Sequence, residues 1–455
     1  MDTIAAISTP YAIGGIATIR ISGEDAVNIA AKVFRPQNEN KDILKMAGYT
    51  ACYGEVFNKE DKLDDGVLLV FRAPKSYTGE DVVEISVHGG LYVSKQVLRA
   101  VFENGARPAE AGEFTKRAFL NGKMTLTQAE AVADIISANG NALHKAALSA
   151  RDGELYKKVS EITEIVVSIC ADIAAWVDYP EEDVPELTDA EISKKLIVAK
   201  NELTSLLSGY DTGIMLRQGV STAIVGKPNA GKSTLMNLLS RTQRSLVTEI
   251  AGTTRDVVEE SVRLDDDILL KLSDTAGIRQ TEDIVEALGV SLAKQKMMQS
   301  ELVLAVFDLS EPQTEEDFEI LSQLDTASAV AVLNKQDLPQ KLDTEQIEKI
   351  FPEVITISAK SGAGKAELID AVRRIIRKKG TDLNAPLLIN ERQRTCVVRA
   401  LSLIDEALSA VQSGITLDAI GATLDLAADE LLVLTGKKAT DAVVAEVFSR
   451  FCVGK

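Results

Sequence analysis

The sequence contains few of the residues that build disulfide frameworks or zinc sites, with only four cysteines and two histidines among 455 residues. The cysteines are far apart and show no C-x-x-C spacing: Cys52, Cys170, Cys396 and Cys452. This scarcity argues against a disulfide framework and against a zinc site. A bound metal ion would therefore need oxygen ligands, such as hydroxyl, carboxylate and carbonyl groups.

Long apolar runs and a basic leader are also missing. The sequence has no apolar run of about 18 residues or more, which a membrane-spanning helix would need. The first residues, Met1-Asp2-Thr3, lack the positive charge that opens a signal peptide. We expect a cytoplasmic protein that makes no membrane contact.

Positive charge is in the minority, since there are 50 lysines and arginines against 68 acidic residues and the formal net charge is −18. Extensive non-specific contact with a nucleic-acid backbone requires clustered basic side chains and is therefore disfavoured. Two basic runs, Arg373-Arg374 and Arg377-Lys378-Lys379, end a segment of helical period. Cations at a helix C-terminus commonly complement its dipole, so we favour this structural role over an RNA-binding patch. We expect any contact with RNA to be local or assisted by a partner.

The chain is too long for one hydrophobic core, and its patterning changes along its length. Residues 1–120 mix short β-branched runs with segments of helical period, which predicts an α+β domain. Residues 121–215 and 379–455 carry apolar residues at three and four spacing, which is typical of helices. Residues 216–378 alternate apolar strands with helices, as in a doubly wound α/β domain. The sequence therefore predicts a multidomain chain with an α/β domain inserted into a helical domain, although its short connections also allow independent domains.

The most informative motif is a phosphate-binding loop, Gly226-Lys-Pro-Asn-Ala-Gly-Lys-Ser233, which matches G-x-x-x-x-G-K-[ST]. It lies between an apolar run that predicts a strand and a segment that predicts a helix. Its glycines allow backbone N–H groups to face phosphate oxygens, Lys232 neutralises phosphate charge, and Ser233 is placed to bind Mg²⁺. The residues of this loop and of the position after it that we assign to the nucleotide are Asn229, Ala230, Gly231, Lys232, Ser233 and Thr234.

Further segments follow in the order found in guanine-nucleotide sites. Asp274-Thr275-Ala276-Gly277 comes after an apolar run and would place its aspartate near Mg²⁺ and its glycine near the γ-phosphate. In Asn334-Lys335-Gln336-Asp337, the Asp337 carboxylate can accept hydrogen bonds from two guanine donors, whereas adenine would leave that carboxylate unpaired. Ser358-Ala359-Lys360 adds a backbone N–H for the guanine oxygen. These segments together predict a protein that binds and hydrolyses GTP.

The groups that speed hydrolysis in many GTPases are not evident in the sequence. Ile278 stands where small signalling GTPases carry the glutamine that orients the attacking water. The carboxylates that could replace it, each of which could also be a solvated charge, are Glu282, Asp283 and Glu286. An added cation at the phosphates typically raises turnover about 10³- to 10⁵-fold, and neither Arg255 nor Arg279 is self-evidently that cation.

These motifs, with Ala251-Gly-Thr-Thr-Arg-Asp256 and the C-terminal Cys452-Val-Gly-Lys455, resemble those of the MnmE (TrmE) family of tRNA modification GTPases. The resemblance covers the whole chain. Ser76-Tyr-Thr-Gly-Glu-Asp-Val82 and Gly112-Glu-Phe-Thr115 look like segments of the folate-binding domain of that family. The C-terminal Cys-x-Gly-Lys is the most specific signature, because it adjoins no general GTPase element.

The resemblance implies a potassium-dependent GTPase with one inserted, Ras-like G domain per chain. Two such G domains would associate across their nucleotide faces. K⁺ would stand in for an arginine finger, and its ligands would be Asn229, Thr248, Ile250 and Thr253. Thr254 would join Ser233 on Mg²⁺, and Glu286 aligns with the catalytic glutamate that orients water. The first switch would contact GTP through Thr248, Glu249, Ile250, Ala251, Gly252, Thr253 and Thr254.

The resemblance also implies that the N-terminal domain forms a homodimer and binds 5-formyl-tetrahydrofolate or a related one-carbon folate. The positions carried over for folate are Arg20, Glu84, Lys123 and Lys455. A carboxylate suits the ring donors of a pterin and cations suit its glutamate tail, although Arg20 and Glu84 taken alone could equally be strand-face charges. Cys452 matches the reactive cysteine of the family, with a small apolar filler in a C-terminal helix as the alternative.

The function implied is a GTPase acting with the FAD-dependent protein MnmG, in a heterotetramer or larger complex. Together they would add a carboxymethylaminomethyl or aminomethyl group at C5 of the wobble uridine of certain tRNAs, with GTP hydrolysis driving a conformational cycle. The alternative is a non-enzymatic GTPase switch in ribosome or RNA assembly, for which no folate binding is expected. A GTP-binding scaffold without useful turnover is a third possibility, which measurable hydrolysis would eliminate.

Overall fold

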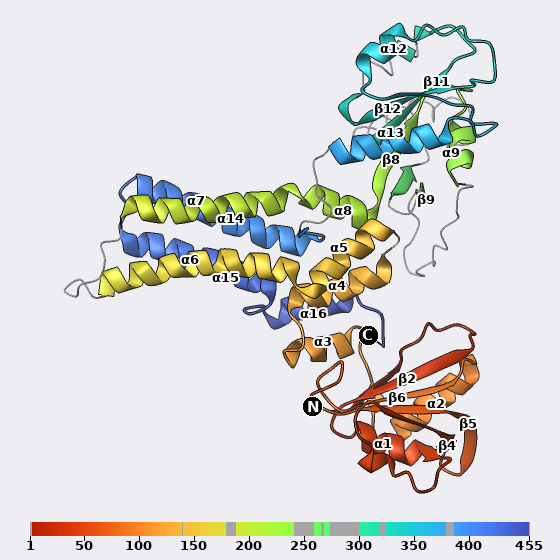
Figure 1. Cartoon of the computed structure of the whole chain (residues 1–455), viewed down its shortest axis with the longest axis vertical. Coiled ribbons are helices and arrows are strands. Elements are labelled where there is room, and N and C mark those ends of the chain that lie inside the picture. Colours follow the sequence, from red (N-terminus) through yellow and green to blue (C-terminus); the bar gives the residue numbers. More distant parts are fainter. Residues whose placement is uncertain are drawn as a thin grey trace, which may run out of the picture. The chain divides into compact units, whose positions relative to one another are not determined.

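The computed structural model describes residues 2–138, 140–178, 188–240, 259–264, 268–273, 300–315, 317–318, 324, 326–378 and 386–454 (Figure 1). These residues form two compact units. The first unit contains Met1–Ile136, Ala150–Ala199 and Ser402–Lys455. The second contains Ser137–Ser149 and Lys200–Leu401. The boundaries predicted at residues 120, 215 and 378 stay a prediction.

The N-terminal part of the first unit is a mixed sheet of seven described strands in the order β3-β4-β5-β6-β2-β1-β7. All neighbouring pairs are antiparallel except β1 with β7. The strands are β1 Ile4–Ile7, β2 Ile16–Ser22, β3 Phe34–Pro36, β4 Thr50–Asn58, β5 Asp61–Phe71, β6 Val82–His88 and β7 Arg107–Pro108. The helices beside this sheet are α1 Ala26–Val33 and α2 Leu91–Glu103, with a 3₁₀ turn η1 at Ile43–Lys45.

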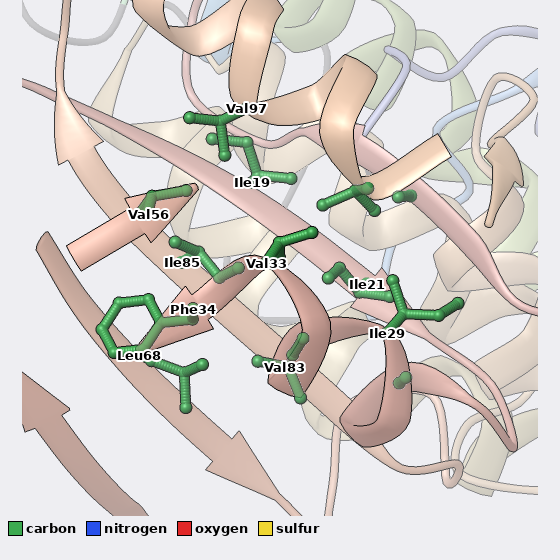
Figure 2. Packing of buried hydrophobic residues seen from close by; sticks show 14 of the residues in the cluster. Ile19, Ile21, Ile29, Val33, Phe34, Val56, Leu68, Val83, Ile85 and Val97 are labelled. Carbon is green, nitrogen blue, oxygen red and sulfur yellow. The ribbon is translucent and has the colours of Figure 1, made fainter. Parts of the chain in front are cut away.

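Alternation along β2 and β6 separates an apolar face from a polar face. Ile19 and Ile21 of β2 lie beside Ile85 and Val83 of β6 in register and are fully buried, packing against α1 and α2 as Figure 2 shows. Successive side chains of a strand point to opposite faces. Arg20 lies between the two apolar positions of β2, and its register partner Glu84 lies between those of β6. Both side chains are therefore on the other face of the sheet.

Helices make up the rest of the first unit. α15 packs along α6, and a separate apolar cluster joins α4 with α16. The helices assigned to this unit are α3 Glu113–Leu120, α4 Leu126–Ser137, α6 Glu154–Asp178, α15 Leu417–Thr435 and α16 Asp441–Ser449. The cuts between the units fall near the end of α4, within α5 Asn141–Asp152, and within α7 Asp189–Ser208 and α14 Glu391–Gln412.

The second unit contains a sheet of six described strands in the order β13-β12-β11-β8-β10-β9. Its neighbours are parallel except β9, which is antiparallel to β10. The strands are β8 Val220–Val225, β9 Glu259–Arg263, β10 Leu269–Ser273, β11 Leu302–Asp308, β12 Ala329–Asn334 and β13 Val354–Thr356. The helical elements of the unit are α5 Asn141–Asp152, α8 Tyr210–Gln218, α9 Lys232–Ser240, η2 Thr326–Ser328, α12 Glu345–Ile350 and α13 Lys365–Lys378.

The central strands of this second sheet explain where a ligand can bind. Every residue of β11 and β12 is buried, as expected for parallel strands covered on both faces. β8, β11, β12 and β13 run in the same direction, so their carboxyl ends lie at one edge of the sheet. Ligands of open α/β sheets bind at that edge.

The sequence-based expectations for these elements agree with the structure. The mixed N-terminal domain, the helical segments and the α/β domain are all present in the described residues. At the end of α13, Arg373 pairs with Asp370 at 2.9 Å and Arg374 pairs with Glu353 at 2.8 Å, so both have acidic partners within the fold. Among the residues described, no helix combines the length and the apolar character required to cross a bilayer.

Candidate functional site

The phosphate loop leaves the carboxyl end of β8 and leads into α9. A Cβ atom at Gly226 would stand 2.4 Å from the carbonyl oxygen of Val306 on β11, so only glycine allows the loop to lie this close to the strand. Gly231 has a φ of +101°, and a Cβ there would stand 2.1 Å from the Asn334 side-chain nitrogen. Both glycines of the motif are therefore required by close packing as well as by the backbone.

The polar groups of the loop are placed for phosphate and metal contact. Lys232 Nζ donates to the carbonyl oxygens of Gly226 at 2.7 Å and Lys227 at 2.9 Å, which holds the ammonium group across the loop. Ser233 lies in the first turn of α9 with an exposed side chain. Asn229 is also exposed and has a left-handed backbone, with a φ of 62°. An ammonium, a helix N-terminus and exposed side-chain oxygens suit a polyphosphate and its cations.

Asn334 connects the phosphate loop to the expected base-binding segment. Its side-chain nitrogen donates to the Ala230 carbonyl oxygen at 2.9 Å, and its side-chain oxygen accepts from the Ala359 N–H at 3.0 Å. Asn334 is only 2% exposed, so each of these bonds replaces a contact with water. Three of the sequence-predicted segments are thus brought together through one side chain.

The expected guanine acceptor is exposed beside this connection. Ser358 Oγ donates to Asp337 Oδ1 at 2.7 Å, and this hydrogen bond holds the pKa of Asp337 below its usual value. Asp337 is therefore ionised at neutral pH, as acceptance from two donors on one base requires. Lys360 is exposed at the same edge, whereas Ser358 and Ala359 are buried. This arrangement can present one carboxylate to a guanine base.

Lys335 has a partner that the sequence motifs do not include. Its Nζ lies 2.5 Å from Asp308 Oδ2, at the end of β11. Burial raises the pKa of Asp308, but hydrogen bonds from Lys335 and Ser310 outweigh it and hold the pKa below its usual value. The signal for Asp308 was available, since it ends an apolar run just as Asn334 does.

Several predicted site residues lie outside the described part of the chain. They are the first-switch residues Thr248, Glu249, Ile250, Ala251, Gly252, Thr253 and Thr254, the second-switch residues Asp274, Thr275, Ala276 and Gly277, the catalytic candidate Glu286, and Lys455. Their assignments remain predictions. The described site therefore contains the phosphate loop and the base-binding segments.

In the sheet of the first unit, Arg20 on β2 and Glu84 on β6 face each other. Arg20 Nε donates to Glu84 Oε1 at 2.8 Å, and Arg20 Nη1 donates to the Gly454 carbonyl oxygen at 3.3 Å. The guanidinium lies 5.8 Å from the Tyr77 ring centroid and 5.6 Å from that of Phe114. The C-terminal end of the chain is thus beside two of the predicted folate residues.

The structure treats the other two described candidates of this unit differently. Lys123 Nζ donates to the carbonyl oxygen of Pro74 at 3.0 Å, and no described contact joins it to Arg20 or Glu84. Cys452 is exposed and lies beyond the end of α16, so the alternative of an apolar filler within a helix is wrong. Arg450 is bound to Glu446 at 2.7 Å. A chemical role for Cys452 stays a prediction.

A buried ion network near this site was missed by the sequence reasoning. The Arg117 side chain is 4% exposed and contacts Asp2 at 2.8 Å, Glu80 at 3.1 Å and Glu113 at 3.1 Å. Burial raises the pKa of Glu113, but hydrogen bonds led by that from Arg107 outweigh it and lower the pKa. These partners are far apart in sequence, and each alone resembles a surface charge.

The N-terminal and helical parts both match known family models. A model described as the GTP-binding protein TrmE N-terminus matches residues 3–123. A model described as the MnmE helical domain matches residues 126–452. A solved structure of Era from Aquifex aeolicus is 27% identical and covers 40% of this chain and 66% of its own chain. The TM-score of this match is 0.27.

Curated relatives are similar over the full length of the chain. The tRNA modification GTPase MnmE of Thermoanaerobacter pseudethanolicus is 39% identical over 459 residues, covering 100% of this chain and 99% of the relative. The protein of the same name from Enterococcus faecalis is 41% identical over 460 residues, covering 100% of this chain and 98% of the relative. With both family models and these relatives in agreement, the chain belongs to the MnmE family of tRNA modification GTPases.

Proposed function

We propose that this chain is a K⁺-dependent GTP hydrolase that acts with the FAD-dependent partner MnmG on certain tRNAs. The reaction served is the addition of a carboxymethylaminomethyl or aminomethyl group at C5 of the wobble uridine. One observation supports the nucleotide part: Asn334 bonds to both Ala230 and Ala359, so the phosphate loop and the expected base-binding segments lie together at one edge of the sheet. The family to which the chain belongs carries the tRNA part.

The described residues suit the chemistry of phosphoryl transfer to water. Water attacks the γ-phosphorus, the bond from that phosphorus to the bridging oxygen of GDP breaks, and negative charge develops on that oxygen. Lys232 lies where an ammonium group stabilises this charge. When bound, Mg²⁺ and K⁺ would add positive charge at the phosphates. Ser233 would hold Mg²⁺ with Thr254, and Asn229 would hold K⁺ with Thr248, Ile250 and Thr253.

The residue proposed to place the attacking water is Glu286, and its assignment rests on the resemblance of the sequence to the family. Asn229 and Ser233 are exposed and suit the proposed cation sites, because amide and hydroxyl oxygens are ligands of hard cations. GTP turnover measured in equal concentrations of KCl and NaCl tests this proposal. We expect strong activation by K⁺ that Asn229→Ala abolishes and that Asn237→Ala, an exposed asparagine on α9, leaves intact. Equal rates in both salts would contradict it.

We also propose that the N-terminal domain binds a 5-formyl-tetrahydrofolate-type one-carbon donor. Support comes from the Arg20–Glu84 pair and from the Gly454 carbonyl oxygen beside it, which belongs to the residue that precedes Lys455 in the sequence. A carboxylate can accept from pterin donors, and a cation can bind the glutamate tail. Calorimetry with 5-formyl-tetrahydrofolate should show binding to the unmodified chain and at least about tenfold weaker binding to Arg20→Gln. The exposed Arg35→Gln should bind normally, and equal affinity in all three would contradict the site.

The proposed homodimer is supported by an exposed apolar patch at the start of β2 and α2. Tyr11 is 58% exposed, Ile13 85%, Ile16 66% and Tyr92 75%. The Gly14 N–H donates to the Gly89 carbonyl oxygen at 3.1 Å, which brings the two parts of the patch together. Large exposed apolar groups gathered in one place are typical of protein contacts. Ile13→Asp should therefore lower the mass measured by sedimentation, whereas Leu44→Asp, also at an exposed site, should not.

The negative net charge of the chain supports the proposed complex with MnmG. A formal net charge of −18 disfavours broad contact with a tRNA backbone by this chain alone. A basic partner surface would then supply much of that contact. Titration of labelled tRNA with the chain, with MnmG and with both should show tight binding only when MnmG is present.

A further inference from the structure

The end of β11 and the segment that follows it carry two buried carboxylates that belong to none of the nucleotide motifs. Asp308 is 2% exposed and Asp317 is 1% exposed. Aspartate is almost never buried to this degree unless it is paired. Each of these carboxylates accepts a hydrogen bond from the lysine of a different nucleotide-binding loop.

Asp308 fixes Lys335 in the base-binding loop. Lys335 Nζ lies 2.5 Å from Asp308 Oδ2, while the other carboxylate oxygen accepts from the N–H and hydroxyl of Ser310 at 2.9 and 2.7 Å. Both oxygens of the carboxylate are therefore held in place. Lys335 has a left-handed backbone with a φ of 69°, and its carbonyl oxygen accepts from the Leu338 N–H at 3.0 Å. The anchored lysine thus begins the tight turn that contains Asp337.

Asp317 fixes Lys227 in the phosphate loop. Lys227 is 6% exposed and its Nζ donates to Asp317 Oδ2 at 3.2 Å. The same oxygen accepts from the N–H and hydroxyl of Thr314, each at 2.9 Å. The carbonyl oxygen of Lys227 in turn accepts from Lys232 Nζ at 2.9 Å. Holding the far end of Lys227 therefore fixes a backbone oxygen that orients the phosphate-binding lysine.

We propose that Asp308 and Asp317 are positioning residues of the nucleotide site, through which the end of β11 and the segment after it hold the base-binding loop and the phosphate loop in register. Asp308 acts through Lys335 and governs base selection. Asp317 acts through Lys227 and governs affinity for the phosphates. The first half rests on the proposed role of Asp337 as the guanine acceptor, and the second half rests only on the phosphate loop.

The Asp317 half is tested with a variant that leaves no buried charge behind. Replacing both members of a buried ion pair with apolar groups is often neutral for stability, whereas removing one member is strongly destabilising. We expect Lys227→Met with Asp317→Leu to fold with a normal thermal midpoint. We expect it to bind fluorescent GDP at least about tenfold more weakly, with kcat for GTP also reduced. Lys227→Arg alone keeps the positive charge beside Asp317. This variant should therefore retain most of the affinity for GDP.

The Asp308 half is tested by base discrimination. ITP lacks the amino group that Asp337 would accept, so competition between GTP and ITP reports on the placement of that carboxylate. We expect Asp308→Asn to narrow the preference for GTP over ITP by at least about threefold and to weaken GTP binding. If Asp308→Asn does not fold, Asp308→Glu serves instead, because its extra methylene displaces Lys335 while keeping the charge. Asp370→Asn, at an exposed ion pair on α13, is the matched control and should change neither quantity.

The outcomes separate this inference from the proposed function. Wild-type affinity and turnover in the folded Lys227→Met, Asp317→Leu variant would overturn the Asp317 half. An unchanged GTP-over-ITP preference with only a lowered thermal midpoint in Asp308→Asn would overturn the Asp308 half. If the unmodified chain shows no preference for GTP over ITP, the role of Asp337 fails. The Asp308 half is then judged by GTP affinity alone.

Discussion

The side-chain amide of Asn334 donates a hydrogen bond to the carbonyl oxygen of Ala230, which lies 104 positions earlier in the chain, at 2.9 Å. The same side chain accepts from the Ala359 N–H at 3.0 Å. Two loops that are predicted to contact opposite ends of a nucleotide therefore share one buried residue. Their relative placement depends on that residue more than on either loop alone.

Asn334→Ala should weaken nucleotide binding. The substitution leaves a buried carbonyl oxygen and a buried N–H without their partner, and each such group costs about 1–3 kcal/mol. We expect at least about a tenfold loss of affinity for fluorescent GDP, measured by titration. Asn237→Ala, at an exposed position on α9, is the control, and a similar loss in both variants would contradict the role of Asn334.

Gly231→Ala should abolish nucleotide binding. The new Cβ would stand 2.1 Å from the Asn334 side-chain nitrogen, at a φ of +101° that residues with side chains rarely adopt. Gly362→Ala provides the comparison, because its φ is +84° but the nearest atom to a Cβ at this position, Leu238 Cδ1, would be 3.7 Å away. We expect Gly362→Ala to cost only the strain of about 1–2 kcal/mol, read as a modest shift in thermal midpoint. Normal binding by Gly231→Ala would show that the loop lies elsewhere.

The ion network around Arg117 should make the stability of the first unit sensitive to acid. The pKa of Glu113 is lowered, because hydrogen bonds from Arg107, the Glu110 N–H and Arg117 outweigh the effect of burial. A lowered pKa adds stability that is complete above the unfolded value of about 4.3 and is lost as pH falls through the folded value. The thermal midpoint of unfolding of the unmodified chain should therefore fall steeply below about pH 4.5.

Glu113→Gln should flatten that acid dependence. The variant should be less stable at pH 7, because Arg107 and Arg117 lose a charged partner, and its midpoint should change less between pH 5 and 3. Glu39→Gln, at an exposed position of the same unit, should keep the slope of the unmodified chain. Parallel pH profiles for all three proteins would rule out the network as the cause.

His88 should titrate above the usual histidine value. A hydrogen bond from its ring to Asp64 at 2.8 Å, together with the charge of Asp64, raises the pKa of His88. Any stability from this pair is present below about pH 6.5 and is lost as pH rises through the raised pKa. NMR titration can resolve the ring signal, since the sequence has only two histidines and His144→Gln identifies the other. Asp64→Asn should return the His88 pKa toward about 6.5, and an unchanged value would contradict the pairing.

Sequence alone was sufficient for the parts of this protein that depend on local signals. The phosphate loop and the Asn334–Asp337 segment each combine a short motif with an adjoining apolar strand, and the structure places both at one edge of a parallel sheet. The strand-face positions of Arg20 and its neighbours follow from two-residue alternation in the same way. Such patterns can be recognised without knowing what packs against them.

The rest depends on contacts between residues far apart in the chain. Lys227 pairs with Asp317, 90 positions later, and Arg20 donates to a carbonyl oxygen 434 positions later. Arg117 gathers partners from three separate segments. Nothing in the local pattern distinguishes these charges from solvated ones, because their burial is set by tertiary packing.

The most direct test of the account is the modified-nucleoside content of tRNA from cells that lack this chain, measured by mass spectrometry. Supplying the unmodified chain should restore the C5 modification of the wobble uridine. Supplying Lys232→Ala at the same protein level should not, because the ammonium group at the phosphates is missing. Full modification with Lys232→Ala would contradict the claim that GTP hydrolysis at this site drives tRNA modification.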